Sequence, residues 1–157
     1  MLMNCTIPGG SYAGWGWGAS MINTEMVIFS ADATTPTVGT YYSTKKGAPG
    51  ADAKYEPCYT STIKDLGNGF IEFITTRPLD CNIADSYVVA LDTELQLITA
   101  WNPTNPVLSF HSNNFLEFTQ LFASDGSCTL VEAEGHNLQY YIHGVFMWTA
   151  WALIGLL

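Results

Sequence analysis

The succession of short extended segments, separated by turn residues, constrains the fold more than any other feature of the sequence. Residues 59–78 carry Leu66-Gly67-Asn68-Gly69 between two runs rich in Thr, Ile and Phe, which predicts a hairpin with a tight turn. The runs YAGWGWG at residues 12–18 and MVIF at residues 26–29 suit strands of a sheet that is buried on both sides. Further extended segments are expected at residues 38–42, 87–90 and 95–101.

Residues 114–122 (NFLEFTQLF) are ambiguous, because their apolar spacing fits a helix or a strand almost equally well. The number of short strands nevertheless favours an all-β fold, an immunoglobulin-like antiparallel β-sandwich, over any α/β arrangement. The 157 residues suit one such domain. We expect it over residues 1–135, followed over residues 136–157 by a linker and the truncated start of a membrane helix.

The charge balance excludes one large class of partner. The chain has 14 Asp and Glu against 5 Lys and Arg, and its only adjacent basic pair is Lys45-Lys46. Nucleic-acid binding needs clustered cations that neutralise phosphates, so we expect no nucleic-acid partner.

The four cysteines indicate disulfides more than metal binding. Cys5, Cys58, Cys81 and Cys128 show no Cys-x-x-Cys spacing, so neither a zinc ribbon nor a thioredoxin-type motif is predicted. Three pairings of four cysteines are possible, with Cys58–Cys81 our first expectation, and four buried thiols are the alternative. Asn4 begins the acceptor sequence Asn4-Cys5-Thr6 for N-glycosylation, which fits an extracytoplasmic location.

Catalytic motifs are lacking in the sequence. It contains no Gly-x-Ser-x-Gly elbow, phosphate loop or zinc-protease helix. Asp80, Asp85 and Asp92 lie close together in sequence and would suit a calcium site or a glycosidase pair. They lack ordered ligand spacing, so we expect solvated loop residues and no hydrolase chemistry.

The C-terminal run YIHGVFMWTAWALIGLL at residues 141–157 carries no formal charge except what His143 holds. It is slightly shorter than the roughly 20 residues of a membrane helix, and we interpret it as a truncated span. Met1-Leu2-Met3 leads directly into a polar, Gly-rich stretch, so a leader has been removed or the chain is a fragment.

Four strings, in order, carry a resemblance to a known family: AGWGWGASMINTEMVIFSAD, GFIEFITTRPLD, LITAWN and LSFHSN. The first resembles the start of DOMON domains, a family of heme- or sugar-binding β-sandwiches related to the cytochrome domain of cellobiose dehydrogenase. The next two are similar to that family's strand ending in Arg-Pro-Leu-Asp and its late strand ending near Ala-Trp. The last supplies a His where the heme-binding members carry one.

This resemblance implies that Met21 and His111 are the axial ligands of a heme b. A thioether and a neutral imidazole complete a six-coordinate iron, which suits electron transfer. Other roles stay open for these residues. Met21 would serve equally as a gap-filler, Met26 competes as the ligand, and a lone His is more often a hydrogen-bonded surface residue.

Aromatic residues flank the two implied ligands. Trp17 and Trp101, together with Trp15 and Phe110, would line an apolar crevice for the macrocycle, or would belong to the ordinary core. Arg77 would pair with a heme propionate, or alternatively with a local Asp.

The tail GHNLQYYIHGVFMWTAWALIGLL resembles the beginning of the transmembrane cytochrome b five-sixty-one family, in which His143 would ligate an intramembrane heme iron. The alternative for His143 is an interfacial position at the start of a helix. DOMON domains fused to such a membrane cytochrome are a recognised architecture. It implies an extracytoplasmic, membrane-anchored domain that relays electrons to the remaining membrane helices, as in a ferric reductase, with an unidentified redox partner.

Two other functions stay open. A heme-free DOMON module would bind carbohydrate or protein in an extracellular adhesive or structural assembly. A Soret absorption band distinguishes the two functions, because only the heme-binding domain has one. A cleaved lipid-anchor signal is the other reading of the tail, with small residues at 124–127 before a polar spacer. An exposed sandwich edge would also permit homo-oligomers.

Overall fold

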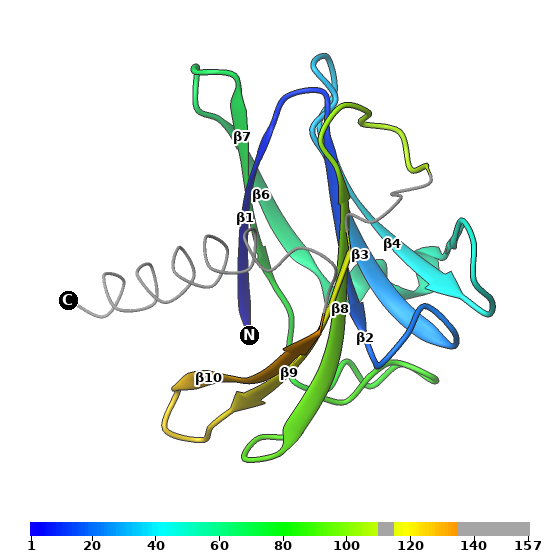
Figure 1. Cartoon of the computed structure of the whole chain (residues 1–157), viewed down its shortest axis with the longest axis vertical. Helices are drawn as coiled ribbons and strands as arrows, with labels where there is room; N and C mark the ends of the chain where they lie inside the picture. The colour runs from blue at the N-terminus through cyan, green and yellow to red at the C-terminus, as the bar shows by residue number, and fades with distance from the viewer. Residues whose placement is uncertain (110–114, 135–157) are drawn as a thin grey trace.

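The chain folds into two antiparallel β-sheets that face each other, which confirms the predicted β-sandwich (Figure 1). The computed structural model describes residues 1–109 and 115–134. One sheet has the strand order β1-β7-β6 and the other β10-β9-β8-β2-β3-β4-β5. The elements are β1 (Leu2–Pro8), β2 (Tyr12–Trp17), β3 (Thr24–Ser30), β4 (Thr37–Ser43), β5 (Gly50–Ala51), the 3₁₀ helix η1 (Ala53–Cys58), β6 (Thr60–Asp65), β7 (Phe70–Thr76), β8 (Glu94–Asn102), β9 (Phe115–Phe122) and β10 (Cys128–Glu134).

Alternate residues of β3, β7 and β8 form the centre of the core between the sheets. On β7, Ile71 and Phe73 point inward, and the Phe73 ring lies 5.5 Å from the ring of Phe29 on β3. Val27 and Leu97 belong to the same cluster and are fully shielded from solvent. This strict alternation fixes the register, because a slip of one residue would turn the apolar set away from the core.

The hairpin predicted from Leu66-Gly67-Asn68-Gly69 is confirmed as β6–β7. The Leu66 amide donates to the Phe70 carbonyl at 3.1 Å and closes the turn. Gly67 and Gly69 have φ values of 73° and 84°, in the left-handed region where a residue without a Cβ is not strained.

One segment left open by the sequence is decided, and one prediction needs correction. Phe115–Phe122 is a strand rather than a helix, because it pairs with β8 as strand β9. Residues 87–90 were expected to be extended but form no strand. They lie in an irregular segment that crosses one end of the sandwich, where Val89 enters the core and the Val89 amide donates to the Leu79 carbonyl.

The predicted membrane segment lies outside the described residues. Within residues 1–109 and 115–134 no helix is long and apolar enough to cross a bilayer. The boundary expected near residue 135, the linker and His143 also fall outside that part of the chain.

Candidate cofactor-binding face

Strand β3 is buried on both of its faces, which is unusual for a two-layer sandwich with one solvated side per sheet. Val27 and Phe29 point into the core between the sheets. Met26 and Ile28 alternate with them and point the other way, yet each is only 6% exposed. A second apolar layer therefore lies on the face of the seven-stranded sheet that is turned away from β1, β7 and β6. We call this the outer face.

Apolar side chains and glycines of adjacent strands form the floor of the outer face. In β2, Gly14 and Gly16 lie opposite Ile28 and Met26. A Cβ at Gly16 would lie only 2.8 Å from Cγ1 of Ile98 on β8, so the glycine allows Ile98 to pack against the strand. The floor is thus apolar, and over β2 it carries no side chains at the two glycine positions.

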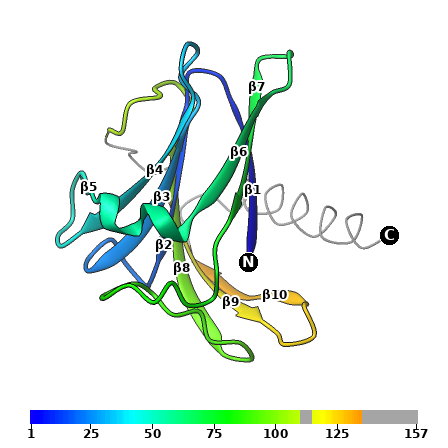
Figure 2. The same ribbon diagram turned by 180° about the vertical axis from the view of Figure 1, so that it is seen from behind.

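The segment 103–109, which follows β8, covers one end of the outer face. The buried Tyr12 hydroxyl donates to the Ser109 carbonyl at 2.5 Å, and the Ser30 hydroxyl donates to the Pro106 carbonyl at 2.7 Å. In both views this segment lies on the side of the sheet away from β1, β6 and β7 (Figures 1 and 2). It leads into residues 110–114, which include the predicted ligand His111 and lie outside the described residues.

Met21 lies in the turn at the other end of the sheet. Residues 18–23 form the turn between β2 and β3, next to Trp17, whereas Tyr12 lies at the opposite end of β2. Met21 is half-buried, with Ile22 and Asn23 exposed beside it. An apolar floor, a covering segment and a nearby thioether are features that suit a flat apolar group such as a heme macrocycle.

The predicted tryptophans lie on the opposite face of the sheet. Trp17 is 1% exposed, belongs to the core between the sheets, and donates from Nε1 to the Tyr59 hydroxyl at 2.9 Å. Trp101 is half-buried and pairs with Ala13, in register with core residue Leu97. The expectation that Trp17 and Trp101 line the crevice is therefore incompatible with a cofactor on the outer face.

Arg77 also differs from its predicted role, because its guanidinium is engaged inside the protein. Its Nη2 lies 3.3 Å from Glu25 Oε2, and the two side chains are 0% and 1% exposed. The guanidinium also donates to the Pro78 carbonyl at 3.0 Å and lies 5.0 Å above the Trp17 ring. The guanidinium therefore lies on the core side of the sheet, out of reach of a propionate on the outer face. Its partner is Glu25, which is far away in the sequence, rather than a neighbouring Asp.

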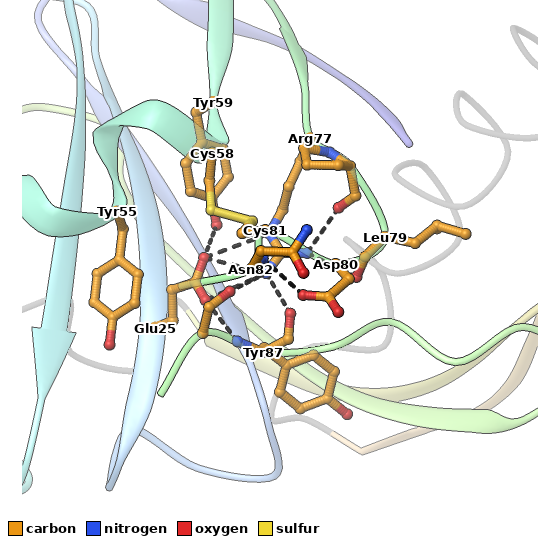
Figure 3. The surroundings of a disulfide bond; sticks show 12 residues. Glu25, Tyr55, Cys58, Tyr59, Arg77, Leu79, Asp80, Cys81, Asn82 and Tyr87 are labelled. Carbon is orange, nitrogen blue, oxygen red and sulfur yellow. Dashed lines mark hydrogen bonds and ion pairs between the residues drawn. A yellow bond between two sulfur atoms is a disulfide. The ribbon is translucent and has the colours of Figure 1, made fainter. Parts of the chain in front are cut away.

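The Glu25 carboxylate accepts several hydrogen bonds besides the ion pair (Figure 3). The Tyr59 hydroxyl donates to it at 2.6 Å and the Tyr87 amide at 2.8 Å. Burial, and then the negative charge of Glu25, raise the pKa of Tyr59. Glu25 was not singled out from the sequence, although a lone carboxylate within the apolar run TEMVIF was a signal that it needed a partner.

The predicted Cys58–Cys81 disulfide is confirmed and links η1 to the irregular segment after β7 (Figure 3). Cys5 and Cys128, in contrast, are outside any disulfide. Both pack against the core, and burial raises the pKa of the Cys5 thiol to about 12 and that of the Cys128 thiol to about 11.

The predicted acceptor Asn4 is exposed on β1, where its Nδ2 donates to Glu72 at 3.3 Å. In the described part of the chain, no group of three His, Cys, Asp or Glu residues is arranged to hold a metal ion.

Comparisons with known proteins agree with this fold. No family model matches the sequence, and no curated protein matches it. Among solved structures, the chain is similar to the cytochrome b domain of pyranose dehydrogenase from Coprinopsis cinerea, with a TM-score of 0.53 and 14% identity. That match covers 75% of this chain and 65% of the other. The cytochrome domain of Myriococcum thermophilum cellobiose dehydrogenase gives a TM-score of 0.46 and 16% identity, over 80% of this chain and 67% of the other. The first similarity shows that the chain shares the β-sandwich fold of that solved domain.

Proposed function

We propose that this chain is a heme b electron-transfer domain whose cofactor lies on the outer face of the seven-stranded sheet. The observation that carries this proposal is the second apolar layer of β3, with Met26 and Ile28 on the face opposite the core between the sheets. The fold supports it, because a solved structure with the same arrangement is named as a cytochrome b domain. The order of the DOMON-like strings along the chain supports it further.

Met21 and His111 are the residues that would hold the heme iron. Met21 belongs to the turn at 18–23, and the segment held by Tyr12 leads into residues 110–114, which include His111. Met26 and Ile28 would exclude water from the macrocycle. A heme with thioether and imidazole ligands supplies one-electron chemistry at a raised reduction potential.

A reduced-minus-oxidised visible spectrum of the full chain, purified from heme-replete cells, tests this function. We expect a low-spin heme b spectrum that Met21→Ala and His111→Ala each convert or abolish. Met26→Leu is the matched control, because Met26 is the competing thioether and Leu keeps the floor apolar. A colourless chain contradicts the proposal and favours the heme-free carbohydrate- or protein-binding module. A spectrum lost only in Met26→Leu reassigns the sulfur ligand.

We also propose that the domain lies on the extracytoplasmic side of a membrane. The Cys58–Cys81 disulfide supports an oxidising compartment, and exposed Asn4 supports passage through a secretory lumen. When the chain is secreted from eukaryotic cells, glycosidase treatment should lower its apparent mass. The same treatment should leave Asn4→Gln unchanged, and an unshifted native chain would rule out glycosylation at this site.

Membrane anchoring rests on residues 141–157 and on their resemblance to the cytochrome b five-sixty-one family. His143 would there ligate an intramembrane heme, and the remaining helices would complete a relay to or from the outer-face heme, as in a ferric reductase. The full chain should stay with membranes after alkaline carbonate extraction, whereas a chain that ends at Glu134 should be released. Release of both chains would contradict the anchor.

A further inference from the structure

We propose that Thr24 is the positioning residue for Met21, an inference that rests on the proposed heme ligation. Thr24 is the first residue of β3 and is only 2% exposed. Its hydroxyl lies 2.5 Å from the Ser20 carbonyl oxygen and 3.2 Å from that of Ile22. These two carbonyls belong to the residues on either side of Met21. The single hydroxyl proton is donated mainly to Ser20 and shared with Ile22, so it ties together the backbone before and after Met21.

The register places Thr24 on the outer face. Thr24 alternates with Met26 and Ile28 along β3, and these three side chains therefore point to the same side of the sheet. Because its hydroxyl reaches back to Ser20, the turn is drawn toward the outer face. The Ile22 amide also donates to the Ser20 hydroxyl at 3.1 Å, which closes the turn around Met21.

Two glycines make room for Thr24. A Cβ at Gly16 would lie 3.0 Å from Thr24 Cγ2, and a Cβ at Gly18 would lie 3.2 Å from Thr24 Oγ1. Gly18 also has a φ of 146°, which L side chains rarely adopt. Gly16 and Gly18 of YAGWGWG therefore leave the space in which Thr24 packs beneath the turn.

A methionine ligand gains particularly from such restraint. Its side chain has three rotatable bonds, and the thioether is a weak ligand that is easily displaced from iron. A ligand must be held within roughly half an ångström of its productive position, which is usually done by residues that do not touch the metal. Thr24 does this through the backbone, without contact with iron.

Thr24→Val is the direct test, in the heme-loaded full chain, because it removes the hydroxyl and keeps the shape. We expect the far-red sulfur-to-iron charge-transfer band of the ferric state to weaken and the reduction potential to fall. One hydrogen bond corresponds to a roughly two- to tenfold rise in the ratio of Met-off to Met-on heme. Thr24→Ser, which keeps the hydroxyl, should restore both readouts.

Thr40→Val is the matched control. Thr40 is also a buried β-strand threonine, 5% exposed, whose hydroxyl donates to a carbonyl oxygen, that of Asp52, at 2.9 Å. A purely structural role for Thr24 predicts that both valine variants lose stability and that neither changes the band. The inference is overturned if Thr24→Val keeps the native band and potential, or if Thr40→Val changes them equally. A native chain that lacks heme or the sulfur band overturns the proposed function itself, and this inference with it.

Discussion

Glu25 and Arg77 place opposite charges out of solvent, joining β3 to the segment that follows β7. Their side chains are 1% and 0% exposed, so the loss of one partner leaves the other charge buried without compensation. We expect Glu25→Gln and Arg77→Met each to lower the free energy of unfolding by about 3–5 kcal/mol. Denaturant unfolding measures this loss. The double variant should lose clearly less than the sum, and strict additivity would show that the two residues are not coupled.

The Cys5 and Cys128 thiols give the protein a dependence of stability on alkaline pH. Burial raises both pKa values above the ordinary 9.0, to about 12 and about 11, so the folded state keeps protons that the unfolded chain releases. The stabilisation is therefore complete below about pH 9 and is lost as pH rises through the folded-state values.

This pH dependence is measured as the urea midpoint at several pH values between about 8 and 10. The native midpoint should stay constant below about pH 9 and fall above it. The variant with both Cys5→Ala and Cys128→Ala should show a shallower decline. Equal slopes for the two proteins would contradict the assignment to thiols.

At the scale of elements, the segment 103–109 depends on Tyr12 for its position over the outer face. Tyr12→Phe removes the hydroxyl that donates to the Ser109 carbonyl, at a cost of about 1 kcal/mol. Amide hydrogen exchange should become faster in residues 102–109, and heme should bind more weakly.

Tyr55→Phe is the control for this experiment. Tyr55 is fully buried, and its hydroxyl donates to the carbonyl of Asp85 at 3.4 Å, in the other long irregular segment. Exchange should change near Asp85 in that variant and not over the outer face. Unchanged exchange of residues 102–109 in Tyr12→Phe would show that other contacts hold the cover.

Elements marked by characteristic turn residues were predicted correctly from the sequence. Elements whose helical or extended conformation depends on pairing with a distant strand were not. The Leu66–Gly69 turn identified the β6–β7 hairpin because its glycines specify the backbone. In β9 the spacing of apolar residues fits the period of a helix and that of a strand, and pairing with β8 makes the segment a strand. Residues 87–90 are as apolar as a strand, but Tyr87 and Val89 are used to close the end of the sandwich.

For the whole molecule, the sequence indicated residue types better than the faces on which they lie. The resemblance indicated Met21 and His111 as heme ligands, which stays a prediction, since His111 lies outside the described residues and Met21 is placed only in the turn between β2 and β3. The core-side position of Trp17 and Arg77 was not predicted, because composition does not tell which side of a sheet a residue takes. Alternation would have separated Trp17 from Gly14 and Gly16, but only the structure shows which of the two faces is the core.

The central claim is that heme lies on the outer face, and side-chain methyl NMR of the chain in the ferrous low-spin, diamagnetic state tests it most directly. Ring-current shifts depend on distance from the macrocycle, so they report its position. The account predicts large shifts for the methyls of Met26, Ile28 and Ile98, and small shifts for Val27 and Leu97 in the core between the sheets. Large shifts confined to Val27 and Leu97, or none in either set, would contradict it.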